Sequence, residues 1–208
     1  MSLPRFAVVD VETSGLSSRR HQVLQVGLVM VEPDGSTGAE WSTLIRLRRP
    51  WNRVGPRRVH GITRRSLRGA PRCAEAMREL AQRIDGAVFA AHNAKFDAEF
   101  LQRTARRCGV VLNLRPRVDT LWLSRMLDPD RLLTHGLSEV SARHGVSIAR
   151  RHDALEDARA TAAVLPQLLA AHGITAADDL EAVLRAQWGA PREANAAESP
   201  SVRGAMRD

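Results

Sequence analysis

Two carboxylates close a short apolar segment near the start of the chain. Asp10 and Glu12 lie at the end of residues 5–11, a run that predicts a buried strand. Because residues i and i+2 of a strand point to the same face, both carboxylates emerge side by side. Adjacent negative charges are unfavourable unless a cation joins them, and Mg²⁺ takes oxygen ligands of this kind. The pair indicates a divalent-metal site, and two solvated carboxylates at a strand end are the alternative.

A second candidate group follows another predicted buried strand, residues 87–91, and opens a helix. Asn93 stands at the predicted N-cap, which places Asp97 in the first turn, near the positive end of the helix. Ligand sites of parallel sheets lie outside the carboxyl ends of the strands. Asp97 is therefore expected beside Asp10 if the two strands are neighbours. Simple helix capping is the alternative.

A third candidate group begins a later predicted helix. Asp153 and Glu156 have the spacing of a capping box, so His152 is expected just outside the helix and Asp157 one turn inside it. Five residues within a helix would turn by about 140°, which would separate the two side chains. His152 therefore needs a non-helical position to share a site with Asp157. The alternative is an exposed loop histidine without a role.

The elements that must position these groups can be predicted from periodicity and turn residues. Three strands come first, and helices and strands then alternate, which predicts an α/β fold with one mixed sheet. Its second and third strands are expected to form a hairpin, because only a short turn segment around Pro33 and Gly35 separates them. The predicted strands cover 5–11, 21–32, 40–47, 87–91 and the vicinity of 117–118. The predicted helices cover 74–84, 94–108, 120–127, 135–145, 153–171 and 176–187.

Taken together, these groups resemble the DEDDh 3′–5′ exonucleases, a ribonuclease-H-like family that includes the epsilon proofreading subunit of bacterial DNA polymerase III and its stand-alone relatives. The resemblance runs from Arg5 to about Gly173, and all five catalytic positions are filled. It implies a mixed five-stranded sheet flanked by helices. The motifs that carry it are VDVETSGL at 9–16, VHGIT at 59–63, HNAKFD at 92–97 and HDALED at 152–157.

The resemblance implies a two-metal hydrolysis. Asp10, Glu12, Asp97 and Asp157 would hold two divalent ions, Mg²⁺ or Mn²⁺, with Asp10 bridging both. His152 would act as the general base, because an imidazole can accept a proton from water near neutral pH. The expected reaction releases nucleoside 5′-monophosphates from the 3′ end of DNA, with single strands favoured. Two alternatives stay open: an exoribonuclease acting on RNA or short oligonucleotides, and a non-catalytic polymerase-associated binding module.

The same resemblance assigns contacts to the terminal nucleotide. For Leu16, Ile62 and Phe96 the alternative is core packing, and for His60 it is a hydrogen bond within its own loop. The expected contact residues are Thr13, Ser14, Gly15, Leu16, His60, Ile62, Asn93 and Phe96.

The length of the chain indicates its domain organisation, and its charge indicates the kind of partner that it binds. The 208 residues suit one exonuclease domain, expected over 1–189, with a disordered tail at 190–208. The net charge is +8, and residues 41–74 contain ten arginines and no acidic residue, which indicates an anionic partner such as nucleic acid. Arg57, Arg58, Arg64 and Arg65 are expected to track phosphates.

The sequence also bears on cellular location, on a further partner and on the state of the cysteines. No apolar run is long enough to span a bilayer and the N-terminus has no secretory layout, so a cytoplasmic protein without membrane contact is expected. A DNA polymerase is a further partner that the resemblance leaves open. Cys73 and Cys108 are too few for a disulfide scaffold and are expected to be free, mostly buried thiols.

Overall fold

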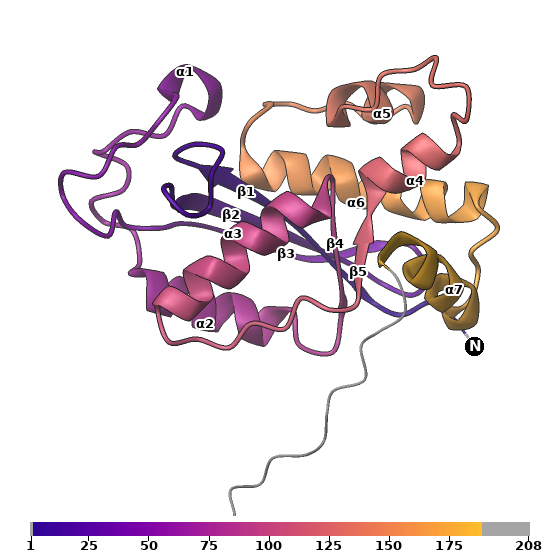
Figure 1. The fold of residues 1–208 in the computed structure, drawn as a ribbon, viewed down its shortest axis with the longest axis horizontal. Helices are drawn as coiled ribbons and strands as arrows, with labels where there is room; N and C mark the ends of the chain where they lie inside the picture. Colours follow the sequence, from indigo (N-terminus) through magenta and orange to yellow (C-terminus); the bar gives the residue numbers. More distant parts are fainter. Residues whose placement is uncertain (1, 189–208) are drawn as a thin grey trace, which may run out of the picture.

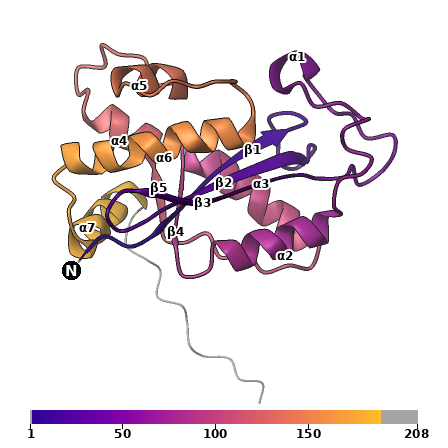
Figure 2. The same ribbon diagram turned by 180° about the vertical axis from the view of Figure 1, so that it is seen from behind.

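A five-stranded sheet with helices on both faces organises the computed structural model, which describes residues 2–188 (Figures 1 and 2). The order across the sheet is β3-β2-β1-β4-β5, with antiparallel pairing on the β2 side of β1 and parallel pairing on its β4 side. The predicted mixed sheet and hairpin are confirmed. The strands are β1 (Phe6–Thr13), β2 (Val23–Val31), β3 (Thr37–Leu44), β4 (Val88–Ala91) and β5 (Arg117–Asp119).

Helices follow the predicted order, with one short addition in the loop after β3. That addition is α1, a single turn that ends at Gly61 in the left-handed conformation. The helices are α1 (Arg57–His60), α2 (Cys73–Arg83), α3 (Ala94–Arg107), α4 (Thr120–Met126), α5 (Leu137–Arg143), α6 (Ala154–Ala171) and α7 (Ala177–Trp188).

Strand β1 is buried on both faces, which explains its nearly continuous apolar sequence. Val9 and Val11 point into the core that contains α2 and α3. Val8 points the other way, into the core formed with α4, α6 and α7. Because side chains alternate along a strand, Asp10 and Glu12 share the face of Val8 and are directed toward the α6 side of the sheet.

The pairing of β1 with β4 decides where the second candidate group lies. Val8 pairs with Ala90 in a parallel ladder, so the carboxyl ends of both strands meet at the same edge of the sheet. Helix α3 begins directly after β4 and carries Asp97 in its first turn. The strands are therefore neighbours, as the placement of Asp97 beside Asp10 requires.

The two cysteines correct a prediction from the sequence. Cys73 begins α2 and Cys108 follows α3, and the two are joined by a disulfide with a Cα–Cα distance of 6.2 Å. The expectation of two free thiols is wrong, because α2 and α3 pack against one another and bring residues 35 positions apart within bonding range.

Two expectations concern the limits of the chain. Within residues 2–188, no helix combines the length and the apolar character needed to cross a membrane. The predicted tail at 190–208 lies outside the described residues, and the division into a domain at 1–189 and a tail stays a prediction.

Candidate active site

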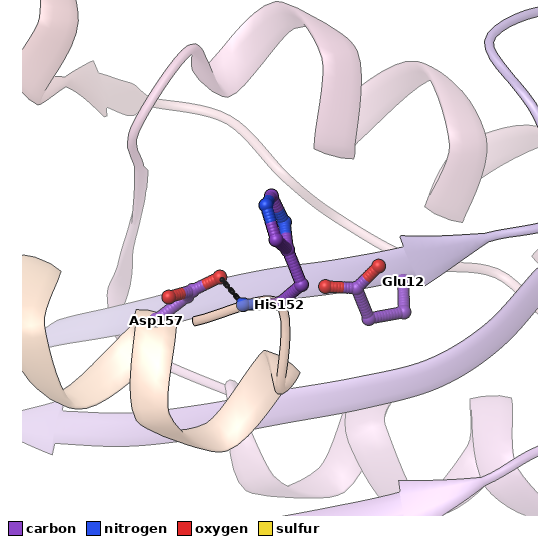
Figure 3. A group of neighbouring side chains, drawn as sticks. All are labelled: Glu12, His152 and Asp157. Atoms are coloured by element: carbon purple, nitrogen blue, oxygen red, sulfur yellow. Dashed lines mark hydrogen bonds between the residues drawn. The ribbon is translucent and has the colours of Figure 1, made fainter. Parts of the chain in front are cut away.

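The end of β1 and the start of α6 bring three of the five candidate catalytic side chains together. Glu12, His152 and Asp157 each offer an atom able to ligate a metal ion, and these atoms lie within 4.8 Å of one another. Figure 3 shows the carboxylates of Glu12 and Asp157 on either side of His152. The juxtaposition joins Glu12 to two residues that lie at least 140 positions later in the sequence.

His152 occupies the non-helical position that the shared site requires. Its φ of 60° places it in the left-handed region, and α6 begins two residues later. Asp153 caps the helix, because its carboxylate accepts hydrogen bonds from the backbone of Leu155 at 3.2 Å and Glu156 at 3.4 Å. Asp157 in turn accepts a hydrogen bond from the backbone N–H of His152 at 3.0 Å (Figure 3). The histidine backbone is thus fixed to a carboxylate of the same site.

Asp97 is fixed to β1 directly. Its carboxylate accepts a hydrogen bond from the backbone N–H of Val11 at 3.1 Å, between the two carboxylates of the strand. Asn93 stands at the predicted N-cap of α3, but its side chain makes no capping hydrogen bond, and the residue has a φ of 69°. The start of α3 is therefore attached to β1 by Asp97 itself.

Burial, reinforced by mutual repulsion, controls the electrostatics of these carboxylates. Burial raises the pKa of Asp10 well above its ordinary value, and the neighbouring charges of Asp97, Asp157 and Glu12 raise it further. Burial, together with the charge of Asp157, raises the pKa of Glu12 to about 7. These shifts show that Asp10 lies near the other carboxylates and that the group favours protons or cations.

Asp97 and Asp157 show the same preference, moderated by hydrogen bonds. Burial raises the pKa of Asp97 well above its ordinary value, although the N–H of Val11 favours the ionised form. Burial also raises the pKa of Asp157, against the hydrogen bond from His152.

The donor set fits hard divalent cations. Four carboxylates offer oxygen ligands only, which suit Mg²⁺ or Mn²⁺ better than softer metals. Fully ionised, they carry four negative charges, which two divalent ions would balance. His152 adds a nitrogen at the edge of the group, where it can ligate or exchange a proton.

A family comparison decides the assignment. The exonuclease family model of the RNase T type matches residues 7–165. The chain belongs to this exonuclease family. It is therefore an exonuclease, and the resemblance to exonucleases inferred from the motifs is confirmed.

Curated relatives of the exonuclease are much longer proteins. It is 31% identical over 179 residues to the PolC-type DNA polymerase III of Thermotoga petrophila, covering 85% of this chain and 13% of that protein. It is 30% identical over 169 residues to the 3′–5′ exonuclease DinG of Staphylococcus saprophyticus, covering 79% of this chain and 18% of that protein. The exonuclease thus corresponds to one segment of each.

A solved structure supports the fold. Exonuclease I of E. coli, crystallised with a dA16 oligonucleotide, superposes with a TM-score of 0.72 at 17% identity, covering 88% of this chain and 43% of that one. At that identity the likeness concerns the fold, which confirms the ribonuclease-H-like mixed sheet.

The residues predicted to contact the substrate differ in how far their side chains are exposed to solvent. Leu16 is 87% exposed, so it is not a core residue, and Asn93 is also exposed. Ile62 is buried with Leu24 and Val54 in a small core of its own and supports the loop from inside. Phe96 is half-buried and packs against the main core. Leu16 and Asn93 offer the larger free surfaces.

In two loops of the exonuclease, groups that were expected to contact the substrate make hydrogen bonds within the protein instead. The ring Nδ1 of His60 accepts a hydrogen bond from the backbone of Ile62 at 3.0 Å, so the histidine holds its own loop. The backbone N–H of Ser14 donates to the Gln22 carbonyl at 3.0 Å and is not free for a nucleotide. Thr13 donates its hydroxyl to the carbonyl of Gly15 at 2.9 Å. Thr13 and Ser14 shape the loop at the end of β1, and His60 shapes the loop after α1. Their contacts with a nucleotide stay predictions.

One positioning residue received no role from the sequence. Asp119 ends β5, is buried, and accepts hydrogen bonds from the backbone of Asn93 and Leu121, each at 3.0 Å. It therefore fixes the turn that delivers Asp97 to the site. Its signal in the sequence was its place at the end of a short strand, at the same edge of the sheet as the other carboxylates.

Proposed function

We propose that this exonuclease hydrolyses phosphodiester bonds at the 3′ end of single-stranded DNA and releases nucleoside 5′-monophosphates. The observation that carries the proposal is the convergence of Glu12, Asp157 and His152. Asp10 lies close enough to this group that the charges of Asp157 and Glu12 raise its pKa. The E. coli exonuclease I structure with bound dA16 supports single-stranded DNA as the substrate. An RNA substrate is the second candidate, because a single-strand exonuclease reads mainly the backbone and base stacking.

Each group has a defined task in this proposal. Asp10, Glu12, Asp97 and Asp157 would hold two divalent ions, Mg²⁺ or Mn²⁺, which when bound neutralise phosphate charge and activate water. His152 accepts the proton of the attacking water on a ring nitrogen. Its backbone N–H donates to Asp157, which holds the His152 backbone beside that carboxylate.

Leu16 and Asn93 are exposed, and each lies four residues in sequence from a carboxylate of the centre, Glu12 and Asp97 respectively. Both are proposed to contact the terminal nucleotide. A DNA polymerase partner, a role in proofreading or repair and a cytoplasmic location are further proposals, for which the similarity to PolC is the main support.

A labelled oligonucleotide tests the proposal. A 20-nucleotide DNA strand with a 5′ fluorophore is incubated with the full chain and Mg²⁺ or Mn²⁺, and matched RNA and duplex substrates are run in parallel. The expected result is a ladder that shortens from the 3′ end, with mononucleotide release that a chelator abolishes. Immediate release of the labelled nucleotide would indicate the opposite polarity.

The Asp10→Asn variant serves as the matched control, because it removes one charge and keeps the shape of the side chain. It is expected to lower turnover by about 10²–10³-fold, the scale associated with loss of one electrostatic stabiliser in an active site. Turnover equal to that of the unaltered chain would exclude the proposed centre.

A further inference from the structure

A large basic groove lies beside the active site and has no role in the chemistry proposed above. Its volume is about 1410 Å³, larger than the roughly 300–1,000 Å³ of small-molecule pockets. Among residues 2–188, ten arginines line it and no acidic residue does. They come from three separate segments: the loop after β1, the loop between β3 and α2, and the end of α3. In Figure 1 the long loop after β3 lies beside the ends of β1 and β2.

The walls of this groove are braced by some of its own arginines. Arg107 of α3 donates to the Arg19 carbonyl at 2.9 Å and ties the helix to the β1–β2 loop. Arg46 donates to the Arg68 carbonyl at 2.8 Å and ties the two sides of the β3–α2 loop. Backbone carbonyls satisfy these donors but leave the positive charges uncompensated. Burial and the neighbouring guanidinium groups of Arg103 and Arg48 lower the pKa of Arg107.

Other arginines of the groove have no ion-pair or hydrogen-bond partner for their side chains within residues 2–188. Arg20, Arg48, Arg49 and Arg53 are exposed, and their side chains make neither ion pairs nor hydrogen bonds with the described residues. The arginines that do form ion pairs there lie elsewhere: Arg5, Arg83, Arg150, Arg159 and Arg185. A concentration of unpaired guanidinium groups is unfavourable without an anion, and guanidinium forks match phosphate oxygens.

An aromatic surface accompanies these charges. Trp51 lines the groove and is 70% exposed, and the guanidinium of Arg49 lies 5.5 Å from its ring centroid. Exposed tryptophan beside arginine is the combination on which unpaired bases stack. A paired base offers no such face.

The groove reaches the loop that follows β1. Ser14, which directly follows β1, is one of its lining residues. Gly55, in the loop that carries Arg53, approaches so closely that a Cβ there would lie 2.4 Å from the Ser14 carbonyl oxygen. One end of the groove is thus next to the loop at the metal-ligand strand.

We infer that this groove binds the sugar-phosphate backbone of an unpaired nucleic-acid strand, in the part of the substrate that lies 5′ to the hydrolysed end. The inference rests on the proposed function, which supplies the 3′ end at the neighbouring carboxylates. The groove holds the strand through the phosphates, and Trp51 receives a base.

Binding without hydrolysis tests the groove. Fluorescence anisotropy with a 20-nucleotide DNA strand is measured for the full chain in a chelator over a range of salt concentrations. The variant Arg49→Gln/Arg53→Gln is compared with Arg78→Gln/Arg106→Gln, which removes the same charge from exposed arginines outside the groove. The groove variant is expected to flatten the plot of log affinity against log salt by about 1.4, at about 0.7 per phosphate contact, and to lose at least tenfold in affinity at low salt.

Equal losses in the two variants would overturn the inference, because only total charge would then matter. An unchanged salt slope in the groove variant would overturn it as well. A 20-base-pair duplex is expected to bind more weakly than the single strand, and tighter duplex binding that depends on Arg49 and Arg53 would overturn the assignment to an unpaired strand.

Failure of the proposed function is measured separately. Metal-dependent hydrolysis of a dinucleotide by the unaltered chain tests the carboxylate centre, since so short a substrate does not extend along the groove. Groove-dependent binding without this hydrolysis would contradict the proposed function and support the groove. Hydrolysis without groove-dependent binding would support the proposed function and contradict the role of the groove.

Discussion

Gly27 of β2 lies directly against Ala154, the first residue of α6. A Cβ at position 27 would be 2.1 Å from the Ala154 carbonyl oxygen, a distance that no side chain can occupy. Gly27 also pairs with Asp10 in the β1–β2 ladder. The missing side chain at position 27 therefore allows the start of α6, which carries Asp157, to approach the strand that carries Asp10.

Replacement of Gly27 by alanine should separate these two elements. The new methyl group meets backbone atoms, which cannot move aside as a flexible side chain can, so α6 must shift. We expect a loss of about 1–3 kcal/mol in the free energy of unfolding, the scale of overpacking in a core, and a larger proportional loss of exonuclease turnover. Urea unfolding and the oligonucleotide assay measure the two effects.

Gly69→Ala is the matched control, because an added Cβ at Gly69 meets no atom within 4 Å. Its free energy of unfolding should stay within about 0.5 kcal/mol of that of the unaltered chain, as expected for a surface substitution. If Gly27→Ala behaves like Gly69→Ala, the close approach does not control the site.

The sequence predicted most of the carboxylate centre because its residues end or begin core elements. Asp10 and Glu12 close an apolar strand, Asp97 stands one turn into a helix that follows another strand, and His152 precedes a capped helix. Each position has a local signature, either a run of buried residues or a capping residue. Parallel pairing of β1 and β4 then leaves one edge of the sheet where the groups can meet.

Features that depend on long-range packing had no such signature. The disulfide partners Cys73 and Cys108 meet only because α2 and α3 pack together, and Gly27 looks like any glycine in a strand. The arginine-rich stretch was visible, but the groove also takes Arg19 and Arg107 from other segments. Arg64, expected to track phosphates, donates instead to backbone carbonyls of its own loop.

His152 is predicted to accelerate the proton transfer without being required for the carboxylate arrangement. Because its φ is 60°, asparagine is the suitable replacement, since it tolerates the left-handed region better than alanine. His152→Asn keeps the backbone hydrogen bond to Asp157 and should slow turnover by about 10²–10⁴-fold, as for loss of a general base. Mn²⁺ affinity, measured by calorimetry, should change little. Turnover as fast as that of the unaltered chain would exclude His152 as the general base.

The disulfide predicts a redox-dependent stability. Closure of the chain between Cys73 and Cys108, 35 positions apart, should contribute about 3–4 kcal/mol to the free energy of unfolding. Reductant should lower the denaturant midpoint of the original chain and have no effect on Cys73→Ser, which should already show the loss. Thiol alkylation of the unfolded, unreduced protein should modify neither cysteine, and modification of both would show that the bridge is absent in solution.

The metal-free protein should lose stability as the pH rises. Glu12 has an ordinary pKa of 4.5 and a folded-state pKa of about 7, so between these values the folded protein binds more protons than the unfolded chain. The free energy of unfolding must then fall with increasing pH, by about 3 kcal/mol for Glu12 across that window. The raised pKa values of Asp10 and Asp97 act in the same direction.

Thermal unfolding in a chelator at pH 5 and pH 8 measures this loss. Glu12→Gln cannot titrate at position 12, so its stability should vary less between the two pH values. Saturating Mg²⁺ or Mn²⁺ should stabilise the original chain more at pH 8 than at pH 5, because cations compete with protons for the same carboxylates. A metal-free protein that is more stable at pH 8 than at pH 5 would contradict the raised pKa values of the carboxylate cluster.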